Sequence, residues 1–433
     1  MEEKNIVEWL NKKIASLQES HVQDDVDPDT LSEGDLQRQR DARIKRIKSI
    51  DAAFEKFPTL EKVCKDWSNN VIDSCFTTFV FEEPSLDTEE FNIRENYFMN
   101  FANLAGRNLR HIDLSEEYAS SGIMQCIKTD CQNLKSLCLA FYEVKSEDFE
   151  NFFSNMSYLK SLVIKWDCED STLPETLVKS LEQVGGTLEY FEVQSYSDEI
   201  HLCLPYSLAS VFPRLIALES LCIEGFQIVQ PLFQSIGEMK NLEKLSLECD
   251  FLNTFEYVYP IGLFKNLTSL SITNYDYITN EFLVYLCNNA QKIIYLTIGG
   301  TNITDDGIIA LNNLEQLEQF NINLWGSTVK KMKFITNESI QCLFNKNLRS
   351  LWLSNCIKIT NISVIKLLEN LPNLDTLYVQ NTKVTYDVVE EISKSSKYRE
   401  KELKIYVSFE DREGRFPIIK TSHNIVFRDK LYL

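Results

Sequence analysis

The histidines and cysteines of this chain are the residue types that most often bind zinc in proteins. The four histidines are scattered along the sequence: His21, His111, His201 and His423. Of the twelve cysteines, Cys126, Cys131 and Cys138 lie closest together, but no histidine stands at ligand spacing beside them and no C-x-x-C pair occurs. We therefore expect buried thiols of the kind found in reduced proteins, and no metal site.

Catalytic motifs are also missing from the sequence. It contains no G-x-S-x-G, P-loop, H-E-x-x-H or dinucleotide-binding fingerprint. With 64 acidic residues, some carboxylates will meet by chance, so a carboxylate pair alone would not indicate acid–base catalysis. We expect no catalytic residues, no cofactor and no enzymatic activity.

Aromatic residues near the C-terminus suggest binding instead. Trp352, Tyr378 and Tyr406 follow one another at spacings of 26 and 28 residues. Large aromatic side chains dominate the energetics of protein interfaces. Whether these three act together depends on the elements that carry them.

Those elements are repeats of the pattern L-x-x-L-x-L. Twelve copies occur at intervals of 24 to 31 residues. Their first positions are Leu109, Leu134, Leu159, Leu188, Leu218, Leu242, Leu267, Ile293, Leu317, Leu348, Leu374 and, with the apolar residue lost, Glu402. This spacing predicts an α/β leucine-rich-repeat solenoid, a horseshoe with a parallel sheet on its concave face and helices on its convex face.

In such a sheet Trp352, Tyr378 and Tyr406 occupy the same strand position and point out of the core, so they should form a ladder with a spacing of about 4.8 Å. We predict that the ladder binds a partner, and that Tyr190 and Tyr295 contribute to the same concave face. The alternative is that the C-terminal segment folds back and covers the ladder.

The first 50 residues lie outside the repeats. Residues 5–17 show the apolar spacing of an amphipathic helix. An acidic block from Asp24 to Asp35 follows and indicates a solvated linker. The basic run from Arg38 to Lys48 is either an anion- or partner-binding patch or a charged helix face neutralised by that block, and we favour the second interpretation.

Residues 51–81 contain a helix signal followed by a strand signal. The segment F-P-T-L-E-K-V-C-K-D-W-S-N, from Phe57 to Asn69, places four apolar side chains on one side of a helix: Leu60, Val63, Cys64 and Trp67. Phe76, Phe79 and Phe81 then have the form of a repeat strand without leucines. The chain here resembles the F-box and leucine-rich-repeat protein family. The segments N-C-I-K-I-T-N at 355–361 and T-N-I-T-D-D-G at 301–307 resemble the cysteine-containing repeats of that family.

This resemblance implies a function. The chain would be the substrate-recognition subunit of a cullin-based ubiquitin ligase, with Leu60, Val63, Cys64 and Trp67 bound to the F-box adaptor and a protein substrate held on the concave sheet. The alternative is a leucine-rich-repeat scaffold that does not bind the adaptor, in which the Leu60–Trp67 helix only caps the open end of the solenoid.

Charge and hydropathy narrow the range of partners. The net charge of −20 and the pI of about 4.8 disfavour binding to a phosphate backbone. No apolar run is long enough for a bilayer, and the charged N-terminus is not a signal peptide, so we expect no membrane contact and a cytoplasmic or nuclear location.

We expect a monomer within a complex, with the solenoid over residues 82–408 and a cap over 409–433 that contains an extended segment at Ile425–Phe427. Asn302 and Asn361 should each satisfy backbone groups in the turn after their own strand.

Overall fold

The computed structural model describes eleven stretches of the chain. They are residues 77–81, 88–143, 145–168, 173–195, 202–251, 265–273, 278–299, 302–322, 331–395, 399–412 and 416–428. The chain divides into two compact units, one made of residues 1–68 and 85–97 and the other of residues 69–84 and 98–433. Of the first unit, only residues 88–97 are described, and there Arg94 donates to Glu90 one helical turn away, at 2.8 Å. The predicted adaptor-binding residues Leu60, Val63, Cys64 and Trp67 lie outside the described residues.

The second unit is built on one largely parallel sheet. Among the described residues it contains 16 strands, which neighbour one another in the order β1-β2-β3-β4-β5-β7-β8-β9-β10-β11-β12-β13-β14-β16-β15, with β6 beside β7. The strands are β1 (Thr78–Val80), β2 (His111–Tyr118), β3 (Ser136–Phe141), β4 (Ser161–Trp166), β5 (Tyr190–Ser195), β6 (Leu202–Cys203), β7 (Ser220–Ile228), β8 (Lys244–Phe251), β9 (Ser269–Thr273), β10 (Tyr295–Gly299), β11 (Gln319–Asn321), β12 (Ser350–Trp352), β13 (Thr376–Val379), β14 (Leu403–Val407), β15 (Ile419–Lys420) and β16 (Ile425–Arg428). Successive repeats therefore lie side by side in chain order, as the predicted solenoid requires.

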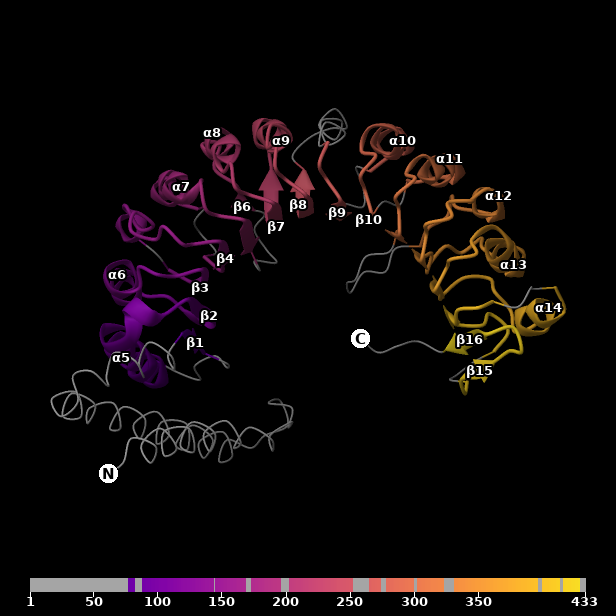
Figure 1. The fold of residues 1–433 in the computed structure, drawn as a ribbon, viewed down its shortest axis with the longest axis horizontal. Coiled ribbons are helices and arrows are strands. Elements are labelled where there is room, and N and C mark those ends of the chain that lie inside the picture. Colours follow the sequence, from indigo (N-terminus) through magenta and orange to yellow (C-terminus); the bar gives the residue numbers. More distant parts are fainter. Residues whose placement is uncertain are drawn as a thin grey trace, which may run out of the picture. The chain divides into compact units, whose positions relative to one another are not determined.

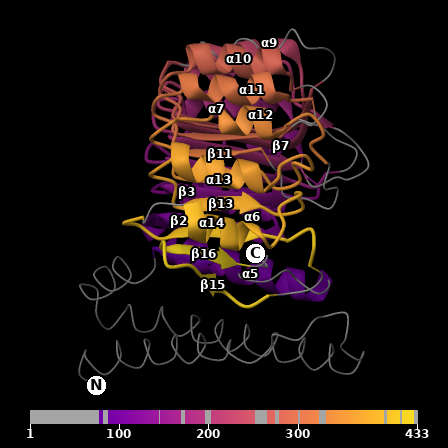
Figure 2. The same ribbon diagram turned by 90° about the vertical axis from the view of Figure 1, so that its right-hand side faces the viewer.

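Helices return the chain from one strand to the next on the outer side of the arc, and the strands line the inner side (Figure 1). The helices are α5 (Thr88–Ala105), α6 (Ser121–Asp130), α7 (Glu175–Leu181), α8 (Leu208–Val211), α9 (Gln230–Gly237), α10 (Asn280–Asn289), α11 (Asp305–Ala310), α12 (Asn337–Gln341), α13 (Asn361–Asn370) and α14 (Val388–Ser395). Seen from the side, α10 to α14 follow one another in chain order (Figure 2). The predicted α/β leucine-rich-repeat fold is confirmed.

The core is formed by the leucines of the repeat. The eleven apolar first positions, from Leu109 to Leu374, are all at most 1% exposed, and only Glu402 in the twelfth repeat is exposed. Burying a leucine fully contributes about 1.5–3 kcal/mol. A single repeat cannot bury these residues alone, so each repeat depends on its neighbours.

The two edges of the sheet differ from the repeats between them. In β1, Phe79 takes the place of a leucine and packs edge-on against Phe98 at a ring-centroid distance of 4.9 Å. At the other edge β16 pairs with β14 in parallel and β15 pairs with β16 in antiparallel orientation. The predicted extended segment at Ile425–Phe427 is thus strand β16, and the two-residue strand β15 leaves only a short free edge.

A ladder of side-chain amides and carboxylates joins the C-terminal helices. The first residue of α10, α11, α12 and α13 accepts a hydrogen bond from the backbone N–H of a threonine in the following repeat, at 2.8 to 3.0 Å. The pairs are Asn280 with Thr304, Asp305 with Thr336, Asn337 with Thr360, and Asn361 with Thr385. The expectation for Asn361 was wrong in its target, because the amide binds the following repeat and not its own turn.

Among the described helices, none is long and apolar enough to cross a membrane.

Candidate functional site

The concave face of the sheet carries the side chains that alternate with the core residues. In parallel strands paired residues point to the same face, so the residues in one register form a column across the sheet. Trp352 pairs with Tyr378, and Tyr378 with Tyr406. The same column continues to Arg428 of β16.

The three aromatic rings of this column stack on one another. The ring centroids of Trp352 and Tyr378 are 3.8 Å apart, and those of Tyr378 and Tyr406 are 4.6 Å apart with an interplanar angle of 8°. Trp352 also donates from Nε1 to Ser350 Oγ at 3.0 Å. The predicted aromatic ladder is present, and its role in binding stays a prediction.

Exposure divides the ladder. Trp352 and Tyr378 are half-buried, whereas Tyr406 is only 6% exposed. Any surface available for contact is therefore offered mainly by Trp352 and Tyr378. Within the described residues, the C-terminal segment extends the sheet through β16 and β15 and is not folded across the ladder.

Three cations lie beside the ladder on the same face. Lys404 pairs with Val426, which pairs in turn with Lys420, and Arg428 pairs with Tyr406. We call these six residues the C-terminal concave surface: Trp352, Tyr378, Lys404, Tyr406, Lys420 and Arg428. Among the described residues none of the three cations is in an ion pair, and Arg428 Nε is buried without a hydrogen-bond partner.

Carboxylates gather in the N-terminal part of the same face. Glu192 of β5, Glu224 of β7 and Glu248 of β8 form what we call the acidic concave cluster, and Glu224 is paired directly with Glu248 in the sheet. Gln194 donates to Glu192 and, at 3.0 Å, to Glu224 Oε2. The hydroxyl of Tyr190 donates to Glu192. Of these three carboxylates, none is ion-paired within the described residues.

Partial burial and repulsion from neighbouring carboxylates raise the pKa of Glu224 and of Glu248. Loss of hydration raises the pKa of Glu224, and the charge of Glu192 raises it further. The pKa of Glu248 is raised by loss of hydration and by Glu224. Burial together with Glu192 also raises the pKa of Tyr190, so its phenol stays protonated and keeps its hydrogen bond.

Tyr190 and Tyr295, the other two tyrosines predicted to bind on the concave face, have different surroundings. Tyr190 is half-buried and bound to Glu192, whereas Tyr295 of β10 is 48% exposed. Small polar side chains separate the two regions on β8 to β10: Ser246, Ser269, Ser271, Thr273 and Thr297. The predicted concave residues thus share one face but do not form one cluster.

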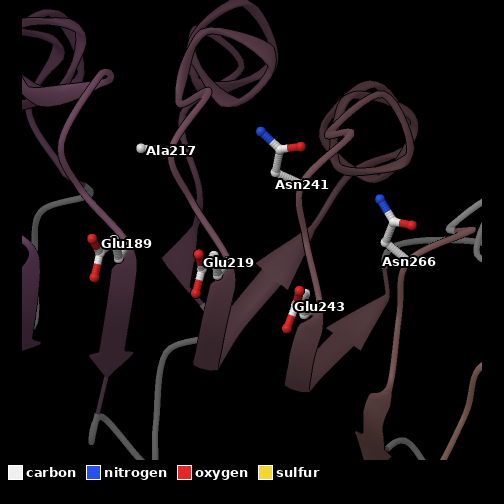
Figure 3. Close-up of a pocket in the computed structure, with 6 residues that line it drawn as sticks. All are labelled: Glu189, Ala217, Glu219, Asn241, Glu243 and Asn266. Carbon is white, nitrogen blue, oxygen red and sulfur yellow. The ribbon is translucent and has the colours of Figure 1, made fainter.

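A pocket of about 280 Å³ lies at the edge of the sheet where the strands begin, lined by Glu189, Ala217, Glu219, Asn241, Glu243 and Asn266 (Figure 3). Its three carboxylates come from residues next to the start of β5, β7 and β8. Lys160 pairs with Glu189 at 2.6 Å, and Asn241 and Asn266 donate to backbone carbonyls of the preceding repeat. Asn241 and Asn266 thus hold neighbouring repeats together.

The three closely spaced thiols, Cys126, Cys131 and Cys138, stay in their protonated form. Burial raises the pKa of Cys126 and of Cys138 to about 12, and Cys131 is fully buried. No group of three or more histidine, cysteine or carboxylate side chains in the described ranges could hold a metal ion.

Sequence reasoning found the ladder but missed its cations. Lys404, Lys420 and Arg428 received no role in it. The useful signal is the register: Lys404 stands two residues before Tyr406, and the segment I-V-F-R at 425–428 repeats the alternation of the strands before it. Its lack of leucines concealed that it continues the sheet.

No model of a known protein family matches the chain. Among solved structures, the chain is similar to one in the Rad7–Elc1 complex from yeast, with 18% identity, a TM-score of 0.50, and coverage of 90% of this chain and 96% of that one. It also resembles an internalin from Listeria monocytogenes, with 15% identity, a TM-score of 0.43, and coverage of 79% and 87%. At 18% identity, the likeness to the chain of the Rad7–Elc1 complex shows a shared fold alone.

Proposed function

We propose that the protein is an interaction module that holds a protein partner on its concave face. The observation that carries this proposal is the stacked ladder of Trp352, Tyr378 and Tyr406, with two of its three rings partly accessible. Stacked rings fixed on a rigid sheet lose little conformational freedom on binding, which favours them as anchors.

We further propose that the module is the substrate-recognition subunit of a cullin-based ubiquitin ligase in the cytoplasm or nucleus. Support comes from the sequence of Leu60, Val63, Cys64 and Trp67, which matches the adaptor-binding helix of F-box and leucine-rich-repeat proteins. A chain of similar fold was solved in the complex of Rad7 with Elc1. A chain with this fold can thus be part of a two-protein complex.

Co-purification of the full-length chain with the F-box adaptor tests this proposal. Trp67→Ala should abolish adaptor recovery, because a core aromatic cut to alanine costs about 3–5 kcal/mol in its local packing. Asp66→Ala, at the preceding residue and outside the apolar side of the expected helix, should leave recovery unchanged. Circular dichroism of both variants should match the unchanged chain, since both changes lie outside the repeats.

The second candidate is a scaffold that does not bind the adaptor. It is favoured if the unchanged chain never recovers the adaptor and Trp67→Ala lowers the melting temperature of the whole protein. That result would assign Trp67 to capping the solenoid and would leave the concave binding face unaffected.

A further inference from the structure

The C-terminal concave surface has the opposite charge to the rest of the protein. The chain carries a net charge of −20. Yet none of the outward-facing residues described on β12, β13, β14, β16 and β15 is acidic, and three of them are cations: Lys404, Lys420 and Arg428. Such a local reversal of sign directs partner choice, because like charges at an interface are strongly disfavoured.

The positions of these cations favour contact with a ligand over contact with the protein's own carboxylates. Arg428 occupies the register position next to Tyr406, and Lys404 lies diagonally beside it on β14. Arg428 is half-buried and is in no ion pair among the described residues. A guanidinium group on such a face can donate two parallel hydrogen bonds to a carboxylate.

We propose, on the basis of the proposed interaction function, that the C-terminal concave surface binds an acidic extended segment of a partner protein. Aspartate or glutamate side chains of the segment pair with Lys404, Lys420 and Arg428. An apolar side chain beside them rests on Trp352 and Tyr378.

The geometry sets the length of this segment. From β12 to β15 there are four strand-to-strand steps, which at about 4.8 Å each span roughly 19 Å. An extended chain rises about 3.3 Å per residue, so about six residues cross the surface. Such a segment would lie across the strands, and the acidic concave cluster at β5 to β8 would repel it if it were placed there.

Fluorescence anisotropy with the full-length chain tests the proposal. The probe is a labelled peptide of about eight residues that alternates glutamate with phenylalanine and leucine, long enough to cross the surface. Its neutral analogue carries glutamine in place of glutamate. The acidic peptide should bind at least about tenfold more tightly than the analogue, and this preference should shrink as salt is raised.

Variants locate the site. The triple change K404Q/K420Q/R428Q should reduce the affinity for the acidic peptide to that for the analogue. The matched control K240Q/K265Q/K346Q removes the same charge from three exposed lysines away from the concave face and should stay within about twofold of the unchanged chain. Arg428 is half-buried, so its replacement by glutamine could disturb local packing. The double change K404Q/K420Q and the conservative change R428K keep a long side chain at position 428. Each should lose part of the affinity for the acidic peptide.

Several outcomes would overturn the proposal. Equal losses in the triple variant and its control would mean that only net charge matters. Equal binding of the acidic and neutral peptides would exclude recognition of carboxylates, and binding of a phosphoserine version alone would assign the cations to phosphate. Each of these results would leave adaptor co-purification through Trp67 unchanged, so failure of this inference is separable from failure of the proposed function.

Discussion

The two halves of the sheet use aromatic residues in opposite ways. Ten of the twelve largest fully buried side chains in the described part of the chain come before β8, and only Phe320 and Phe427 come after it. In the N-terminal half, rings pack in the core, as Phe141 and Trp166 do with ring centroids 5.8 Å apart. The concave face of this half carries carboxylates. In the C-terminal half the core is largely aliphatic, and the rings stand on the concave face.

This difference separates stability from binding. A ring inside the solenoid contributes packing and cannot touch a partner. A ring on the concave face gives up part of its burial but can contact one. The C-terminal repeats obtain cohesion in another way, through the ladder that links each helix to the next.

The largest effect that we predict is on binding through the C-terminal half. W352A/Y378A should weaken binding of the acidic peptide by more than about 2 kcal/mol, the scale of interface hot spots. Each lost ring stack should lower stability by only about 0.5–1.5 kcal/mol. Anisotropy gives the first quantity, and denaturant unfolding gives the second. Y190F, on the acidic half of the same face, should leave peptide affinity unchanged.

The contrary result is equally clear. If W352A/Y378A keeps its peptide affinity and loses several degrees of melting temperature, the ladder is part of the packing, and the two halves do not differ in the way proposed.

The sequence predicted the fold well because a solenoid repeats one local rule. Each L-x-x-L-x-L unit reports its own strand, and twelve of them set the register of Trp352, Tyr378 and Tyr406 without any long-range information. The burial of Tyr406 and the position of Lys420 were not predictable in this way. Tyr406 pairs with Arg428 of β16 and Lys420 lies on the reversed strand β15, and the residues of these two strands do not follow the repeat pattern.

The ladder between helices was missed for a related reason. Pattern reading treats each repeat separately, whereas Asn337 binds Thr360 in the following repeat. The recurring Thr-Asn or Thr-Asp pair at the start of each of these helices is a signal that a comparison of successive repeats would have found.

A second prediction tests cohesion in the C-terminal half. Asn337 accepts from the backbone N–H of Thr360 and from the hydroxyl of Ser363, and it donates to the hydroxyl of Thr360. Asn337→Ala should lower the free energy of unfolding by about 1–3 kcal/mol, because it leaves partly buried groups without partners. Asn337→Asp should cost less, since Asp305 fills the equivalent position naturally and accepts the same backbone bond. Equal losses in urea-induced unfolding would indicate that the amide donor matters most.

The smallest effect concerns the acidic concave cluster and depends on pH. The pKa of Glu224 is raised in the folded protein by loss of hydration and by Glu192, whereas in the unfolded chain it should be about 4.3. Below that pH the group is protonated in both states and no repulsion exists. As the pH rises through the higher folded pKa, the carboxylate ionises beside Glu192 and Glu248, and stability is lost. Glu224→Gln should therefore stabilise the protein at pH 7 by roughly 0.2–1 kcal/mol, the range for like charges on paired strands, and the gain should vanish near pH 4.

Glu219→Gln, an exposed change just before the same strand, removes the same charge but should give a smaller gain in chemical unfolding at pH 7. A gain of the same size from both variants would mean that overall charge, and not the crowding of carboxylates on the concave face, destabilises the N-terminal half.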